Sequence, residues 1–277
     1  MKEDALEFQL LSDSPLIFLI EWDTLRELGR IDVKHAELVI RKKQLDDLKK
    51  DWEELGFEIL PLGHVIRNVN NVVKTSTIQG KEGIPLLSIT FEGKAIRRSE
   101  KLHKKSRMSP ITTKYPTLLK VSAWDVVLSR IDIVNGAVAI IPEDLNDHYV
   151  TKEFMVLRPK KKIIEDKQLI ELIENEYPDV NLQIDSKMVT SWYLWIYLRS
   201  NFVRSYVKGL MKGVTGRHRV KWEQLKHLPV PVPESASLRQ EIAKEVCGVI
   251  IKDYTIQKLI KEKENDIANI QSTLKVK

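Results

Sequence analysis

Residues 211–233 read MKGVTGRHRVKWEQLKHLPVPVP, so a glycine-rich basic turn leads into a segment with proline at every second position. Alternate residues of an extended chain aim their backbone N–H groups to the same side. The three prolines therefore leave one edge of this segment without donors, whereas Val230 and Val232 can still pair on the other edge. The pattern predicts a stiff edge strand that no further strand can join.

A long, regular helix is predicted directly after the prolines, over 235–277. Ser237 followed by Gln240 is a capping-box pattern. Ten positions then follow at alternating spacings of four and three, and eight of them are apolar, the exceptions being Asp253 and Lys263; this is typical of a coiled-coil seam. The seam positions are Ile242, Val246, Val249, Ile256, Ile260, Ile267, Ile270 and Leu274. A helix of about 38 residues would be about 57 Å long, which is more than a domain of this size can bury. We expect a coiled coil, and a long helix lying on its own domain is the alternative.

The remaining segments predict an α+β fold. Apolar periodicity predicts helices over 33–55, 163–176 and 186–211. Short β-branched runs bounded by Gly and Pro make the middle of the chain strand-rich, and Asn135-Gly136 predicts a hairpin with a two-residue turn within 126–141. We expect a mixed β-sheet globule with flanking helices, plus the long C-terminal coiled-coil helix.

This pattern divides the chain into three parts. An N-terminal segment covers 1–55 and includes the helix 33–55. The globule covers 56–234, and the coiled-coil helix covers 235–277.

Charge is segregated along the 277 residues, whose formal net charge is +6. Residues 1–55 carry 9 Lys and Arg against 14 Asp and Glu. By contrast, 94–120 carry 9 against 1, and 204–226 carry 7 against 1. Solvated loops account for many lysine runs, but two basic stretches set apart from an acidic region favour a nucleic-acid partner.

The cysteine and hydropathy patterns bear on the compartment. Cys247 is the single cysteine, so an internal disulfide and a cysteine-based zinc site are excluded, and a reducing cytoplasm is favoured. The apolar run PLIFLI near the N-terminus is six residues long, too short for a signal peptide or a membrane span. We expect a cytoplasmic protein without a membrane partner.

Catalytic motifs are weak in this sequence. It contains no Gly-x-Gly-x-x-Gly or Walker-type loop, and its six histidines are scattered, so no metal or cofactor is expected. Pro178-Asp179 followed by Asp185-x-Lys187 has the order of a Mg²⁺-dependent nuclease site, in which two carboxylates share a metal. The second carboxylate comes only six positions after the first, so a polar connector is favoured, and the nuclease is kept as an alternative. Cys247 lies in the heptad helix without an activating histidine near it in sequence.

A series of segments in a fixed order carries a family resemblance. The series is LPLGHVI, IPLLSI, WDVVLSRIDIVNGAVAIIP, EFMVLRP, YLWIYLRSNFVRSYV, KGVTGRHRV, WEQLKHLPVPVP and the helix start LRQEIAKEV. It resembles the target-recognition domain and following spacer helix of the DNA-specificity (S) subunits of type I restriction-modification systems. The resemblance covers about residues 56–277.

The resemblance implies a non-catalytic protein. It implies that 56–234 is a DNA target-recognition domain whose loops read the major groove of double-stranded DNA, and that the helix sets the spacing of a split site. It also implies methyltransferase (modification) and restriction subunits as partners. A full specificity subunit carries two such domains and two spacers, whereas here there is one of each, so we expect a half-subunit that forms a homodimer or pairs with a second half. A coiled-coil scaffold that does not bind DNA is a further alternative.

Three loops supply the candidate DNA-binding residues. Glycine lets the backbone approach a phosphate, arginine grips phosphate or guanine with two bonds, and asparagine can read adenine. The candidates are Arg67, Asn70, Asn71 and Lys74 in the first loop, Arg97, Arg98, Lys104, Lys105 and Arg107 in the second, and Lys212, Thr215, Arg217, His218 and Arg219 in the basic turn.

Overall fold

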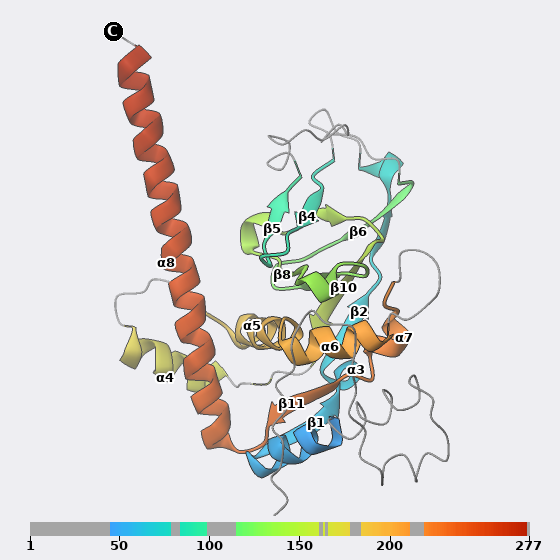
Figure 1. Cartoon of the computed structure of the whole chain (residues 1–277). Coiled ribbons are helices and arrows are strands. Elements are labelled where there is room, and N and C mark those ends of the chain that lie inside the picture. The colour runs from blue at the N-terminus through green and yellow to red at the C-terminus, as the bar shows by residue number, and fades with distance from the viewer. Residues whose placement is uncertain are drawn as a thin grey trace, which may run out of the picture. The chain divides into compact units, whose positions relative to one another are not determined.

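The computed structural model describes residues 45–78, 84–98, 115–160, 163, 166–177, 184–210 and 219–275 (Figure 1). The chain divides into two compact units, Met1–Asp51 and Trp52–Lys277. Residues 45–54 are helical, as the predicted helix 33–55 requires, and its residues 33–44 lie outside the described part.

The second unit is built from short strands and helices, followed by one long helix (Figure 1). The strands are β1 Phe57–Pro61, β2 Ile66–Val69, β3 Val72–Lys74, β4 Leu87–Ile89, β5 Ala95–Arg97, β6 Thr117–Lys120, β7 Val126–Ser129, β8 Val138–Ile140, β9 Tyr149–Val150, β10 Phe154–Pro159 and β11 Pro229–Pro233. The helices are α3 Leu62–Val65, α4 Asp166–Glu176, α5 Ser186–Leu198, α6 Asn201–Leu210, α7 Trp222–Leu225 and α8 Ala236–Lys275, with 3-10 turns η1 Thr75–Thr77, η3 Ile133–Asn135 and η4 Glu143–Leu145. The predicted α+β class with a long C-terminal helix is confirmed.

The strands form four small sheets, in the orders β2-β10-β7-β8, β3-β6-β9, β4-β5 and β1-β11. Neighbouring strands in these sheets pair antiparallel. Parallel pairing occurs in two isolated bridges, Leu86 with Tyr149 and Lys94 with Ile140. Among the described residues, the sheet pattern is therefore mixed through these bridges alone.

The sheet β2-β10-β7-β8 has an apolar core on each face. Along β7, Val126 and Leu128 belong to one buried cluster, and Val127 belongs to another. This division follows from the two-residue period of a strand, which sends alternate side chains to opposite faces. Because both faces are covered, the strand reads as a continuous apolar run rather than an alternating one. Helix α5 contacts β7, β8 and β10 and covers the face to which Leu128 points.

The predicted hairpin is present, but the prediction of a two-residue turn is wrong. Strands β7 and β8 pair antiparallel, and the connection between them contains η3. Gly136 has a φ of +89°, whereas Asn135 is not among the residues with positive φ. The longer connection places Ile133 in the core with no exposed surface, which a two-residue turn could not do.

The predicted helix 186–211 is two helices, because the chain breaks at Arg199 and Ser200. The Ser200 hydroxyl accepts a hydrogen bond from the Val203 backbone N–H at 3.3 Å, which caps the start of α6. No Gly or Pro marks this break, so the apolar periodicity alone did not reveal it.

The proline segment forms the predicted edge strand. β11 pairs with β1 alone, and Val230 and Val232 lie opposite Leu60 and Glu58. Its outer edge is occupied by side chains rather than by a strand. The carbonyls of Pro229, Pro231 and Pro233 accept hydrogen bonds from Tyr197 Oη, from Tyr193 Oη at 2.5 Å and from Arg239 Nε at 3.1 Å, respectively.

Helix α8 starts earlier than the capping pattern predicts. It begins at Ala236, and the Ser235 hydroxyl accepts from the Leu238 backbone N–H at 3.1 Å. Ser235 is therefore the cap, and Ser237 lies within the first turn, so the predicted capping box at Ser237 is wrong. A serine before the helix satisfies an orphan N–H in the same way from either position, so the sequence alone does not separate the two.

Helix α8 changes character along its length. Ala243, Val246, Cys247, Ile250 and Ile251 are buried, and α8 contacts α4 and α5 there. Two predicted seam residues, Ile242 and Val246, thus pack against the core of their own domain, as the alternative reading of this helix expects. Other large apolar side chains of α8 are exposed, namely Val249 and, beyond the buried part, Ile256, Ile260, Ile267 and Ile270. The Leu274 side chain lies outside the described part.

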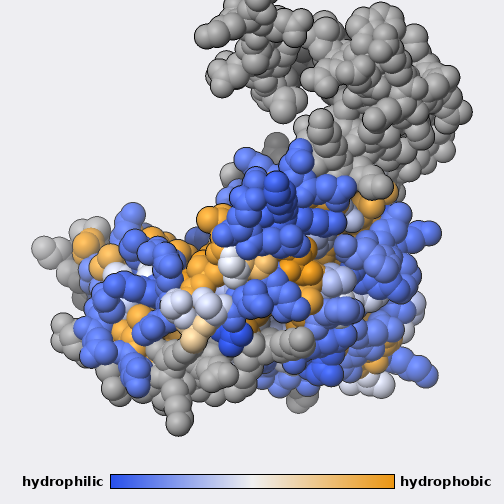
Figure 2. All heavy atoms as spheres, turned by 90° about the horizontal axis from the view of Figure 1, so that it is seen from below, coloured by the Kyte–Doolittle hydropathy of each residue, from blue (hydrophilic) through white to orange (hydrophobic). Residues whose placement is uncertain are grey.

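One face of the molecule is shown by residue hydropathy in Figure 2. Seen from below, hydrophilic residues dominate, and hydrophobic ones reach the surface between them in the middle of the view (Figure 2). No helix among the described residues is long and apolar enough to cross a membrane.

Candidate nucleic-acid interface

The first candidate loop follows β2 and presents four exposed polar side chains. Arg67 is exposed in β2, and Asn70, Asn71 and Lys74 are exposed in the link to β3 and at its end. The backbone of this link is hydrogen-bonded to β6, because the Asn71 carbonyl oxygen accepts from the Lys120 backbone N–H at 2.9 Å. The four side chains themselves make no hydrogen bond to another described residue, so they are available to a ligand.

The second candidate loop is described at its start. Arg97 ends β5, and its Nη2 atom lies 3.2 Å from Asp144 Oδ2 and 3.1 Å from the Asp144 carbonyl oxygen. Both side chains are exposed, and such surface pairs contribute at most about 1 kcal/mol. The Arg98 backbone N–H donates to Leu86 O at 2.8 Å. Lys104, Lys105 and Arg107 lie outside the described residues.

The basic turn is described only at its last residue. Lys212, Thr215, Arg217 and His218 lie outside the described residues. Arg219 is about half exposed, and its Nη2 atom lies 2.7 Å from Glu153 Oε1. The next residue, Val220, is fully buried, and its N–H donates to Arg130 O at 2.9 Å. The turn therefore returns to the globule at the end of β7.

The register of the sheet brings the first and third loops to one end. Val69 of β2 lies opposite Val156, and Ser129 of β7 lies opposite Phe154. The end of β2, the end of β7 and the start of β10 therefore share one end of the sheet. Strand β10 lies between β2 and β7, and neighbouring strands are about 4.8 Å apart, so β2 and β7 are separated by about 10 Å. Asn70, Asn71, Arg130 and Arg219 thus gather at this end.

Sequence reasoning missed two residues at this end. Arg130 reads as an ordinary surface residue of the sheet, and Glu153 carries no motif. In the structure, burial and the neighbouring Arg219 lower the pKa of Arg130, while Glu153 opposes that shift. An arginine directly after a buried apolar strand was the one sequence signal that could have pointed to this position.

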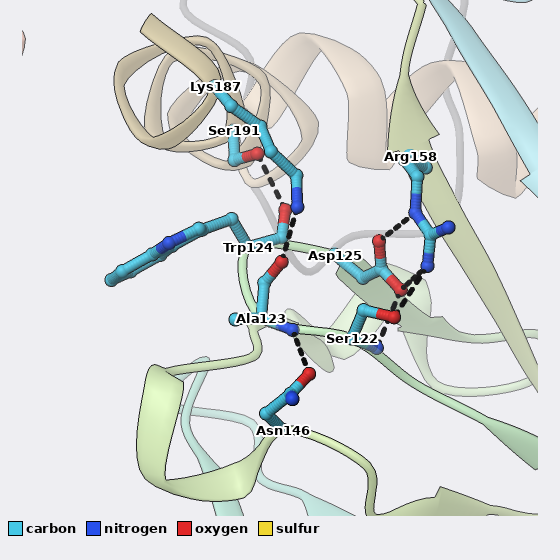
Figure 3. A network of polar contacts seen from close by, with 8 residues as sticks. All are labelled: Ser122, Ala123, Trp124, Asp125, Asn146, Arg158, Lys187 and Ser191. Atoms are coloured by element: carbon cyan, nitrogen blue, oxygen red, sulfur yellow. Dashed lines mark hydrogen bonds and ion pairs between the residues drawn. The ribbon is translucent and has the colours of Figure 1, made fainter. Parts of the chain in front are cut away.

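The residues of the nuclease alternative have structural partners. Asp185 caps α5, since its Oδ1 atom accepts from the Met188 backbone N–H at 2.7 Å. Lys187 Nζ donates to the Ala123 carbonyl at 2.7 Å (Figure 3). Asp179 lies outside the described residues. Among the residues that the structure describes, no group of three His, Cys, Asp or Glu side chains could hold a metal.

A dense polar network fixes the turn before β7 (Figure 3). Asp125 has no exposed surface, and its carboxylate accepts from Arg158 Nε at 2.7 Å and Arg158 Nη2 at 2.8 Å. Ser191 Oγ donates to the carbonyl of Trp124, a residue whose φ is +66°. The network holds Trp124 in a left-handed conformation that a tryptophan rarely adopts. This turn precedes β7, so it lies at the opposite end of the sheet from Arg130.

Cys247 is not placed for nucleophilic chemistry. It is buried in α8, and burial raises the pKa of its thiol to about 11, so very little thiolate forms near neutral pH.

Comparison with known proteins adds structural neighbours. No family model matches the chain, and no curated protein matches it. The HsdS subunit from Thermoanaerobacter tengcongensis is 16% identical, with a TM-score of 0.41, over 76% of this chain and 46% of that one. A chain from a study of complex assembly and conformational transition of the type I R-M system is 13% identical, with a TM-score of 0.39, over 90% of this chain and 56% of that one. The chain thus spans about half the length of each neighbour.

Proposed function

We propose that this chain is a non-catalytic DNA-specificity protein of a type I-like restriction-modification system. One observation carries the proposal. The exposed side chains of Asn70 and Asn71 follow β2 directly, at the end of the sheet where the basic stretch 204–226 returns through Arg219. Arginine and lysine neutralise phosphates, and asparagine can read an adenine edge with two hydrogen bonds.

The second part of the proposal concerns spacing. The edge strand β11 leads directly into α8, and its outer carbonyls are bonded to side chains of α5 and α8. A helix fixed to the DNA-reading globule in this way sets the distance to a second half-site. The exposed residues Val249, Ile256, Ile260, Ile267 and Ile270 are the proposed contact with the helix of a second copy or a second half. A two-fold assembly of this kind reads a split palindrome.

The proposed partners follow from the same role. In a restriction-modification system, a non-catalytic specificity protein acts with a methyltransferase subunit for modification and with a nuclease subunit for restriction. Double-stranded DNA in the cytoplasm is the proposed ligand.

DNA binding across a salt series tests the proposal. If six or more phosphates are contacted, affinity falls by about 1,000-fold or more between about 50 and 200 mM salt. The double variant Asn70→Ala, Asn71→Ala is expected to lose preference among duplex sequences while the salt dependence is kept. Lys244→Ala is the matched control, because Lys244 is a surface cation paired with Glu176 on α4.

Two outcomes would contradict the proposal. A flat salt response, or no DNA binding even with a methyltransferase partner present, would favour the scaffold alternative. Cleavage of plasmid DNA with Mg²⁺ that is lost in Asp185→Ala would favour the nuclease. Sequencing of methylated bases in the host genome would identify the site that is read.

A further inference from the structure

Glu153 lies beside two arginines, Arg130 and Arg219, at the end of the sheet where the candidate interface lies. Arg219 Nη2 is 2.7 Å from Glu153 Oε1, and Arg130 Nε donates to Phe154 O at 3.5 Å. Glu153 Oε2 is buried and has no hydrogen-bond partner among the described residues. One carboxylate thus faces two guanidinium groups and bonds only one of them directly.

The backbone holds these three residues together although they are far apart in sequence. Arg130 N donates to Glu153 O at 3.0 Å, and Val220 N donates to Arg130 O at 2.9 Å. Val220 is fully buried, so the segment that carries Arg219 is anchored in the core. The stems of both arginines therefore start from fixed positions, and little ordering entropy is lost when a ligand binds.

The charges at this place do not cancel. Burial is the largest cause that lowers the pKa of Arg130, and the positive charge of Arg219 is the next. Lys152 and Lys221 are exposed beside the pair in sequence. Asp132 is as close to Arg130 in sequence, so four cations against two carboxylates leave a net charge of +2, which an anion would reduce.

We propose that Arg130 and Arg219 form a phosphate-binding pair for the DNA backbone, and that Glu153 is a positioning residue that orients the Arg219 guanidinium. The choice of a DNA phosphate rests on the proposed function. A planar guanidinium presents its donors in a fork that matches phosphate oxygens, and two forks can hold one phosphate group. The basic turn that ends at Arg219 favours a polyanion over a single carboxylate ligand.

The DNA test compares full-length wild-type protein with Arg130→Ala, Arg219→Ala and the control Lys244→Ala. Each of the two arginine variants is expected to bind about 10-fold more weakly and to lower the slope of log affinity against log salt by about 1. Lys244→Ala should leave the slope unchanged. If wild type shows a steep slope and Arg130→Ala keeps it, the phosphate pair is overturned while the proposed function stands.

A second test needs no DNA and uses inorganic phosphate as the probe. At constant ionic strength with chloride as the balance, phosphate should raise the Tm of wild type and leave that of the double variant Arg130→Ala, Arg219→Ala unchanged. An equal phosphate shift in both proteins would overturn the pair. If phosphate raises the Tm of wild type alone and the protein binds no DNA, the two arginines do form an anion site. The assignment of its ligand as a DNA phosphate is then wrong.

The role of Glu153 is tested by its effect on Arg219. Glu153→Ala should lower the salt slope as Arg219→Ala does, and combining the two should lower it no further, because both remove one interaction. Glu153→Gln keeps an acceptor for the guanidinium and should restore the wild-type slope. A slope that falls again in the combined variant would contradict the positioning role.

Discussion

Tyr193 Oη donates to the carbonyl oxygen of Pro231 at 2.5 Å, and this bond joins α5 to the outer edge of β11. A strand edge without N–H groups still carries carbonyls, and buried carbonyls need donors. Tyr197 and Arg239 supply the donors for Pro229 and Pro233. The alternating prolines thus exclude a further strand, and the side chains that bond their carbonyls fix where α8 begins.

Removing one of these donors should destabilise the domain. In Tyr193→Phe, the Pro231 carbonyl stays buried without its donor, so we expect a loss of about 1–2 kcal/mol in the free energy of unfolding. Denaturant unfolding measures it. Tyr254→Phe is the control because Tyr254 is exposed on α8, and an equal effect of both substitutions would contradict the role of the Tyr193 bond.

The two tyrosines also predict a pH dependence at high pH. Burial raises the pKa of both Tyr193 and Tyr197 above the ordinary value. The unfolded chain ionises its tyrosines near pH 10 while the folded domain keeps these two protonated. Stability is therefore complete below about pH 10 and should fall as pH rises from there. Unfolding measured between about pH 8 and 11 should show a smaller fall in the variant with both tyrosines changed to Phe.

Proline itself is predicted to matter for spacing. Pro231→Ala creates a backbone N–H on the buried outer edge of β11 and removes the fixed φ of proline. We expect looser discrimination among split DNA sites with different spacers before any change in base preference. Binding to a series of spacer lengths measures this, and unchanged spacer discrimination would show that β11 does not set the spacing.

The buried ion pair before β7 is expected to dominate local stability. Asp125→Asn leaves the Arg158 guanidinium without its bidentate carboxylate, so we expect a loss of about 3 kcal/mol. Thermal and denaturant unfolding measure the loss. Asp147→Asn is the matched control, since Asp147 pairs with Lys120 at the surface and its loss should have little effect. A comparably small effect at Asp125 would contradict the prediction.

The exposed seam of α8 is expected to hold two chains together. Ile260→Asp removes an apolar residue from each of two facing helices, which should raise the dimer dissociation constant by about 100-fold. Sedimentation of the full chain measures it. Gln257→Asp introduces the same charge at a nearby polar position and serves as the control. A wild-type chain that is monomeric at all concentrations would rule out the dimer.

Several elements could be predicted from the sequence because the local residue pattern and the fold favour the same structure. The alternating prolines could only form an edge strand, and the β7–β8 hairpin and the long helix both appear as predicted. The turn at Asn135-Gly136 was not readable, because burial of Ile133 in the core outweighs the preference of the dipeptide for a two-residue turn. The break at Ser200 likewise depends on a hydroxyl cap rather than on a helix-breaking residue.

The candidate interface could likewise be predicted only in part from the sequence. Its basic and polar residue types can be picked out one loop at a time, since charge is a local property of the sequence. Which of them meet is decided by strand register, which brings Asn70, Arg130 and Arg219 to one end of a sheet from three distant segments. No local sequence pattern points to Glu153, and its proposed role could be inferred only from where the strand register places it.

By itself, the sequence determined the charge segregation, the strand edge closed by prolines and the heptad spacing of the last helix, because each depends on residues close together in the chain. Only the tertiary structure decided that Ile242 and Val246 are packed within their own domain, and that the exposed seam begins near Val249. The physical reason is that a heptad pattern marks which face of a helix is apolar. Which surface covers that face depends on where the helix leaves the globule.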